Sequence, residues 1–226
     1  IMEWTTANPG DTIELTSLAA LTNNFDVDWG DGSAIATETV DSPTHTYAAA
    51  GTYEVRIKKT STSFSLAMGP SSAANRAQFT KFKNWGIVPL QSLRDMFKDC
   101  ADVTYEATDY PNLTAMNPTA SNSYKSARQM FRGCTSITSL DLSGWQNVDM
   151  LIYNQAFQYM FYQMTNLTLL NVSNWTVGGA TNHNLQYFAQ GIGTATTGCA
   201  FTANNFDLTN CSGTLNFLRS SKVSSV

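Results

Sequence analysis

The chain has 226 residues and a formal net charge of −4 at pH 7, and only 13% of its residues are charged. No run of Lys and Arg occurs, which argues against a nucleic-acid-binding protein, because phosphate contacts need clustered cations. No apolar stretch reaches the roughly 18 residues of a membrane-spanning helix. The length suits two domains. The abundance of Ser, Thr, Asn and Gln favours an extracellular β-rich protein over a cytosolic enzyme.

The first 66 residues alternate apolar and polar side chains, which is the pattern of half-buried β-strands. The alternation is seen in three segments, residues 12–15, 25–29 and 53–57. Gly30 and Gly32 flank Asp31 in a turn that needs positive φ. We therefore predict a small antiparallel β-sandwich over residues 1–66.

Three short strings in this region form a recognisable set. Residues 27–33 read VDWGDGS, residues 45–47 read HTY, and residues 51–55 read GTYEV. In order and spacing the set resembles the marks of the PKD domain family, W-x-F/W-G-D-G and H-x-Y-x-x-x-G-x-Y-x-V. The resemblance implies an Ig-like β-sandwich that serves outside the cell as a spacer or interaction module.

Three acidic residues, Asp26, Asp28 and Asp31, lie close together before Gly32. Because Ca²⁺ takes clustered carboxylates, they are a candidate calcium site, although their spacing differs from that of an EF-hand loop. The alternative is that Asp28 and Asp31 cap the turn through hydrogen bonds to the backbone, and we favour it. For His45 we expect a structural hydrogen bond.

Beyond residue 66, four apolar residues at i, i+3, i+4 and i+7 recur about every 30 residues. The four sets are Leu93, Met96, Phe97, Cys100; Ala127, Met130, Phe131, Cys134; Phe157, Met160, Phe161, Met164; and Leu185, Phe188, Ala189, Ile192. Phe217 and Leu218 belong to a weak fifth copy. The spacing predicts a two-turn helix with one apolar face. So short a helix is unstable alone, so we predict that each copy packs on the next in a stacked array.

A short alternating segment that ends in Trp follows two of these sets. Leu140 and Leu142 precede Trp145, and Leu170 precedes Trp175 in the same way. The alternation predicts a short strand with its apolar side inward, closed by a Trp corner. Stacked strands of this kind would form a parallel ladder.

The string MFRGCTSITSLDLSGW, which ends at Trp145, is similar to the leucine-rich repeats of BspA-type bacterial surface proteins. That family also occurs in some phage structural proteins. The similarity is strong over residues 126–175 and weaker on either side. It implies a mixed fold, in which the sandwich is followed by a short α/β leucine-rich-repeat-like solenoid over residues 67–226. We expect four to five repeats and a capping strand within residues 67–80.

The inward positions of the array form the predicted core. They are Phe97, Cys100, Phe131, Cys134, Leu140, Leu142, Trp145, Phe161, Leu170 and Trp175. Cys100 and Cys134 are then buried core residues rather than reactive thiols. The sequence leaves open whether Cys199 and Cys211 form a disulfide.

Five tyrosines are candidate ligand contacts, because Tyr is large and rigid and has a polar tip. They are Tyr105, Tyr110, Tyr124, Tyr153 and Tyr162.

The sequence contains no motif for a nucleophile with its base, a phosphate-binding loop or a zinc site. We therefore predict no enzyme, and no cofactor apart from the candidate calcium ion. Glu106 and Asp109 are the nearest candidates for the paired carboxylates of a glycosidase. A solvated loop is the simpler interpretation of both.

Three hypotheses for the function follow. The first is a non-catalytic recognition or adhesion module, displayed on a bacterial cell surface or on a phage virion as a fibre or decoration segment, with a host-surface protein or glycan as its partner. The second is a structural assembly protein of a phage particle or filament, bound to neighbouring subunits or to copies of itself as a homo-oligomer. The third is an accessory region of a polysaccharide-degrading enzyme. Both ends look cut, so we expect a longer polypeptide.

Overall fold

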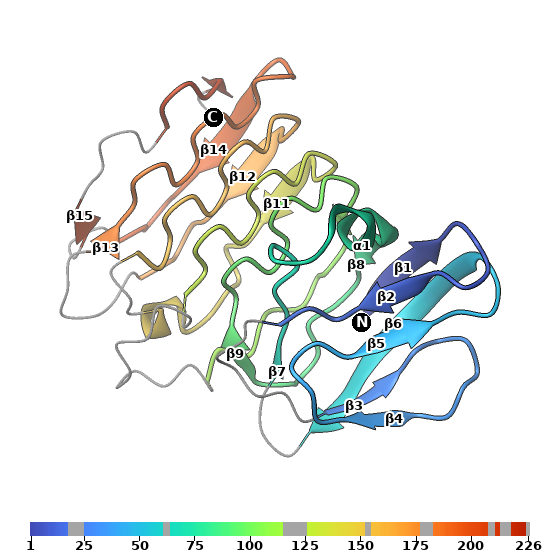
Figure 1. The fold of residues 1–226 in the computed structure, drawn as a ribbon. Helices are drawn as coiled ribbons and strands as arrows, with labels where there is room; N and C mark the ends of the chain where they lie inside the picture. Colours follow the sequence, from blue (N-terminus) through green and yellow to red (C-terminus); the bar gives the residue numbers. More distant parts are fainter. Residues whose placement is uncertain are drawn as a thin grey trace.

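The computed structural model describes residues 1–17, 25–60, 64–114, 126–151, 155–176, 183–207, 211–212 and 218–224. These residues form a β-rich structure with very little helix (Figure 1). In this part of the chain the helices are α1 (Ala73–Gln78) and the one-turn 3-10 helix η1 (Val148–Met150). Neither has the length and apolar character that crossing a membrane requires.

Four antiparallel strands near the N-terminus form part of a six-stranded sheet. They are β1 (Met2–Thr6), β6 (Gly51–Thr60), β3 (Phe25–Asp28) and β4 (Ala36–Glu38), adjacent in that order. A separate antiparallel pair consists of β2 (Thr12–Glu14) and β5 (Thr44–Thr46). The predicted alternation is confirmed in β3, where Phe25 and Val27 are buried and the two aspartates between and after them are partly exposed.

The same sheet continues beyond residue 66 into the rest of the chain. The strand β8 (Phe79–Phe82) pairs antiparallel with β1 on one side and parallel with β10 (Thr104–Tyr105) on the other. The boundary that we placed after residue 66 therefore does not interrupt the sheet. One apolar core runs through both parts of the molecule.

The segment predicted to contain a capping strand, residues 67–80, forms a short helix over most of its second half. Ser72 caps α1 by accepting a hydrogen bond from the amide of Asn75 at 3.1 Å. The side chain of Asn75 accepts a hydrogen bond from the Glu14 amide at 2.8 Å and donates one to the Glu14 carbonyl at 2.9 Å. These two bonds fix the helix to β2.

Four short parallel strands form a second sheet from successive copies of the repeat. They are β11 (Ser139–Asp141), β12 (Leu169–Asn171), β14 (Cys199–Thr202) and β16 (Val223–Ser224), side by side in chain order (Figure 1). The register places Leu140 beside Leu170 and Leu170 beside Phe201, so the inward residues lie at one level. Two further parallel pairs are β7 (Phe64–Ser65) with β9 (Leu90–Ser92), and β13 (His183–Asn184) with β15 (Cys211–Ser212).

All residues of the four apolar sets are buried, as predicted, but none of the sets is helical. Each set is a pair of consecutive turns whose third residue has positive φ. In the first set Asp95 and Asp99 have φ of 57°, and in the second Gln129 and Gly133 have φ of 58° and 71°. The predicted two-turn helices are therefore wrong, although the predicted buried face is right.

Backbone hydrogen bonds explain how these turns are stabilised. Every second amide donates a hydrogen bond within its own copy of the repeat, as the Met96 amide does to the Leu93 carbonyl at 3.3 Å. The amides between them bond to the next copy, as the Phe97 amide does to the Met130 carbonyl at 2.9 Å. A helix would satisfy its amides internally. Here each copy, which we call a coil, depends on the coil beside it.

A column of phenylalanine rings runs through the centre of the stacked coils. The ring centroids are 5.2 Å apart between Phe97 and Phe131, and 5.7 Å apart between Phe131 and Phe161. Phe188 continues the column at 5.0 Å from Phe161. All of these rings are buried, so each coil covers the apolar surface of its neighbour.

Candidate functional site

The strands β11 and β12 end in corners that side chains build by hydrogen bonding to the backbone. The Asp141 carboxylate accepts hydrogen bonds from the Ser143 amide at 3.0 Å and from the Ser143 hydroxyl at 2.6 Å. Because the ionised carboxylate is the accepting form, the bond from Ser143 lowers the pKa of Asp141. In the next coil Asn171 accepts a hydrogen bond from the Ser173 amide at 3.1 Å. The two corners therefore lie at the same place in successive coils.

Two tryptophans fill these corners from the inside. Trp145 and Trp175 are both buried, and their stacked rings lie 5.7 Å apart between centroids. The Trp175 ring nitrogen Nε1 donates a hydrogen bond to the Leu142 carbonyl at 2.8 Å. The prediction that these tryptophans belong to the core is confirmed.

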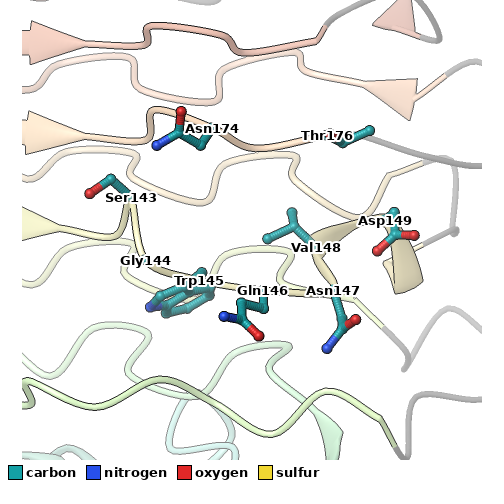
Figure 2. Close-up of a pocket in the computed structure, with 9 residues that line it drawn as sticks. All are labelled: Ser143, Gly144, Trp145, Gln146, Asn147, Val148, Asp149, Asn174 and Thr176. Carbon is teal, nitrogen blue, oxygen red and sulfur yellow. The ribbon is translucent and has the colours of Figure 1, made fainter.

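A groove of about 490 Å³ lies at this corner, across two adjacent coils (Figure 2). We call it the corner groove, and its lining residues are Ser143, Gly144, Trp145, Gln146, Asn147, Val148, Asp149, Asn174 and Thr176. Figure 2 shows the first seven along one coil, with Asn174 and Thr176 on the coil beside it.

Two asparagines of the corner groove lie at backbone positions with positive φ. Asn147 and Asn174 have φ of 57° and 64°, in the left-handed region that Asn adopts more readily than most residues. The side-chain oxygen of Asn174 also accepts a hydrogen bond from the Asn205 amide group at 3.1 Å. The Asn174 amide is therefore held in place before any ligand binds.

The chemistry of the corner groove is mainly that of uncharged hydrogen-bonding groups. Hydroxyls come from Ser143 and Thr176, and amides come from Gln146 and the two asparagines. Asp149 is the one carboxylate among the lining residues. Such groups both donate and accept hydrogen bonds, so they suit a ligand rich in hydroxyl groups.

Tyr110 lies beside the corner groove and is 48% exposed. Its ring packs directly on Gly144, so that a Cβ at residue 144 would overlap the Tyr110 ring. The absence of a side chain at Gly144 thus allows Tyr110 to approach the corner. This is the one predicted tyrosine that the structure brings to the groove among the residues described.

The other predicted tyrosines have different surroundings. Tyr105 was expected on the surface, but its ring packs against Phe82 and Phe131 and its hydroxyl accepts a hydrogen bond from Trp85 Nε1 at 2.8 Å. Tyr105 is therefore a core residue. Tyr162 lies on the outer face of the turns, with the Arg132 guanidinium 5.6 Å above its ring. Tyr124 and Tyr153 lie outside the described residues.

The three aspartates of the candidate calcium site have separate partners. Asp26 accepts a hydrogen bond from the Thr37 hydroxyl at 2.6 Å, and Asp28 accepts one from the Gly30 amide at 3.1 Å. Asp31 accepts one from the Ser33 amide at 3.0 Å and bonds to His45 Nε2 at 2.8 Å. No group of three potential metal ligands was found among the described residues, which include all three aspartates. Asp28 and Asp31 thus cap the turn, the alternative that we favoured.

The two carboxylates considered for glycoside cleavage have structural partners as well. Asp109 accepts hydrogen bonds from the amides of Trp85 and Gly86 at 2.9 and 2.7 Å. Glu106 is 3.1 Å from the Lys81 ammonium group. Asp109 therefore holds the loop that follows β8, and Glu106 forms an ion pair with a residue of β8.

Among the described residues, three cysteines are free thiols and are buried: Cys100, Cys134 and Cys199. Burial raises the pKa of Cys100 to about 12 and that of Cys199 to about 11, and it raises the pKa of Cys134 well above its usual value. The prediction that Cys100 and Cys134 are core residues is confirmed. The side chain of Cys211 lies outside the described residues.

No family model, no curated protein and no solved structure matches this chain.

Proposed function

We propose that this chain is a non-catalytic recognition or adhesion module that binds carbohydrate in the corner groove. In this proposal the N-terminal strands are a PKD-like β-sandwich that acts as a spacer. The stacked coils are a BspA-type leucine-rich-repeat solenoid in which turns stand in place of helices. The module would be displayed outside the cell, on a bacterial surface or on a phage virion.

The chemistry of the corner groove is the observation that carries this proposal. Its amides and hydroxyls match the paired donors and acceptors of sugar hydroxyl groups. The half-exposed ring of Tyr110 lies next to it and offers an apolar face or edge to a sugar ring. A groove with one carboxylate and no neighbouring acid in its lining suits binding better than glycoside cleavage, which uses two carboxyl groups.

The motif residues of the N-terminal part support the spacer role. The Trp29 and His45 rings stack at 5.0 Å, and the Tyr47 hydroxyl donates a hydrogen bond to the Trp29 carbonyl at 2.8 Å. Asp31 completes the cluster through His45. Residues that resemble a family motif thus stabilise one turn of a sheet.

A glycan array of uncharged oligosaccharides, probed with the full chain, tests the proposal. We expect binding that Gln146→Ala and Asn174→Gly each weaken about tenfold, the effect of losing roughly one hydrogen bond of 1.4 kcal/mol. Glycine at residue 174 keeps the positive φ, so the variant should fold. Ser139→Ala, on the exposed face of β11 outside the groove, is the matched control. The proposal fails if no oligosaccharide binds, or if the groove variants bind as well as the control.

A further inference from the structure

A second surface of the coils differs in chemistry from the corner groove. On the outer side of the turns, the first two apolar sets are interrupted by four cations, Arg94, Lys98, Arg128 and Arg132. We call this surface the cationic turn face. It lies on a chain whose net charge is −4, so its charge is opposite in sign to that of the molecule as a whole.

Backbone bonds between the coils bring these cations into two pairs. The Asp95 amide donates to the Arg128 carbonyl at 3.0 Å, and the Asp99 amide donates to the Arg132 carbonyl at 2.7 Å. This parallel register places Arg94 beside Arg128 and Lys98 beside Arg132. Adjacent strands lie about 4.8 Å apart, so like charges are neighbours and repel each other. An anion bound across both coils would relieve that repulsion.

Carboxylates on the protein neutralise only part of this charge. Asp95 is 3.4 Å from the Arg94 guanidinium and 3.9 Å from the Lys98 ammonium group. Asp99 is 3.9 Å from the Arg132 guanidinium. Two carboxylates thus face four cations, and Arg128 has no ion pair with any described residue. The side chains of Arg94, Lys98 and Arg132 are 23%, 24% and 34% exposed.

Tyrosine and glutamine side chains continue the same surface on the next two coils. The rings of Tyr159 and Tyr187 stack at 4.8 Å, and the Tyr162 ring meets Tyr159 edge-on at 5.4 Å. Gln158 donates a hydrogen bond to the Gln186 side chain at 3.4 Å. The cations are therefore flanked by a ridge of packed tyrosine rings, while Gln158 itself is buried.

Backbone strain marks the two stacked tyrosines. Tyr159 and Tyr187 both have φ of 59°, a conformation that costs a bulky L-residue about 1 kcal/mol or more. Four residues further on, the second positive-φ position is Gln163 after Tyr159 and Gly191 after Tyr187, and of these only glycine adopts positive φ freely. Asp95 and Gln129 hold the same position in the first two sets with φ of 57° and 58°, so this conformation belongs to the turn and the tyrosines share it.

We propose that the cationic turn face and its tyrosine ridge bind an acidic polysaccharide. Carboxylate or sulfate groups would pair with Arg128 and Arg132, and sugar hydroxyls would bond to the tyrosine hydroxyls. Nucleic acid fits less well, because recognition of single strands relies on open aromatic faces on which bases stack. The stacked faces of Tyr159 and Tyr187 leave no gap between them for a base.

Chondroitin sulfate, which has both carboxylate and sulfate groups, is the probe, with uncharged dextran and single-stranded DNA of similar length for comparison. Calorimetry on the full chain should show chondroitin sulfate binding that weakens as salt rises. Arg128→Gln and Arg132→Gln should each reduce affinity at least tenfold. Tyr187→Asn, which tolerates positive φ, should reduce it several-fold. Arg56→Gln is the charge-matched control, since Arg56 pairs with Glu54 in the N-terminal sheet.

The outcomes separate this proposal from the one for the corner groove. We expect Asn174→Gly to leave chondroitin sulfate binding unchanged, and Arg128→Gln to leave binding of uncharged oligosaccharides unchanged. Absence of chondroitin sulfate binding overturns the inference, as does an equal loss of affinity in the Arg56→Gln control. Binding of the DNA as tight as that of the polysaccharide also overturns it, in favour of a general polyanion site.

Discussion

The N-terminal strands and the stacked coils bury their apolar residues in different ways. In the N-terminal part the contacts do not recur along the chain, as in the ring cluster of Trp29, His45 and Tyr47. In the coils the same contacts recur, and each apolar set is covered by equivalent residues of the next copy. A change in the N-terminal part should therefore act locally, whereas a change in one coil should also weaken its neighbours.

The largest expected effect comes from removing a ring from the centre of the column. Phe131 is fully buried between Phe97 and Phe161, so Phe131→Ala should lower the free energy of unfolding by about 3 to 5 kcal/mol. Urea unfolding followed by circular dichroism measures the loss. Hydrogen exchange should show weaker protection in the coils on both sides of residue 131. Protection lost in that coil alone would contradict the comparison, and Leu169→Ala, at a 37% exposed position, is the control.

Two glycines in one turn of the N-terminal part provide a matched pair with a smaller effect. Gly30 and Gly32 both have φ of 83°, but only at Gly30 would a Cβ meet backbone, 2.6 Å from the Glu54 carbonyl oxygen. Gly32→Ala should cost about 1 kcal/mol from the backbone conformation alone. Gly30→Ala should cost about 1 to 3 kcal/mol more, because β3 and β6 must move apart. Equal losses of stability for the two variants in a thermal or urea melt would contradict a tight approach between Gly30 and the Glu54 carbonyl.

The smallest expected effect is the acid sensitivity of that turn. Burial acts to raise the pKa of Asp31, but hydrogen bonds from Ser33 and His45 outweigh it and lower the pKa to about 2. A carboxyl whose pKa is lower in the folded state stabilises the fold above its unfolded pKa of about 3.8. That stability should be lost as the pH falls from about 4 to 2. Asp31→Asn keeps the turn geometry and should flatten the pH dependence in this window, and an unchanged slope would refute the assignment.

The hydrophobic pattern predicted the buried residues of the coils but not their backbone. Apolar residues at i, i+3, i+4 and i+7 face one way on a helix, and they also face one way on two consecutive turns with a positive-φ third residue. Gly133 and Gly191 each lie at the third position of a turn, and glycine at that position was the sequence signal for turns rather than a helix. Tyr159 and Tyr187 obscured it, because tyrosine at positive φ is uncommon.

The corner groove could be predicted only in part. The recurrence of Trp145 and Trp175 located the corner and assigned both rings correctly to the core. The polar lining was missed because Asn174 and Thr176 join the groove only through the register of adjacent coils. Tyr105 was misassigned for a related reason, since its inward direction follows from the pairing of β10 with β8.

The alternation of amide bonds in the turns has a consequence for how such a protein can change in length. Successive copies are joined at short turn pairs and at strands of two to four residues. The spacing between Phe97, Phe131, Phe161 and the equivalent Ala189 varies from 34 to 30 to 28 residues. The segments between the joined positions can therefore gain or lose residues without shifting the ladder. A whole coil could be duplicated or deleted in a gene and still leave every remaining copy with a matching neighbour. Adding whole coils would extend the outer faces and would keep the same pattern of amide hydrogen bonds within and between coils.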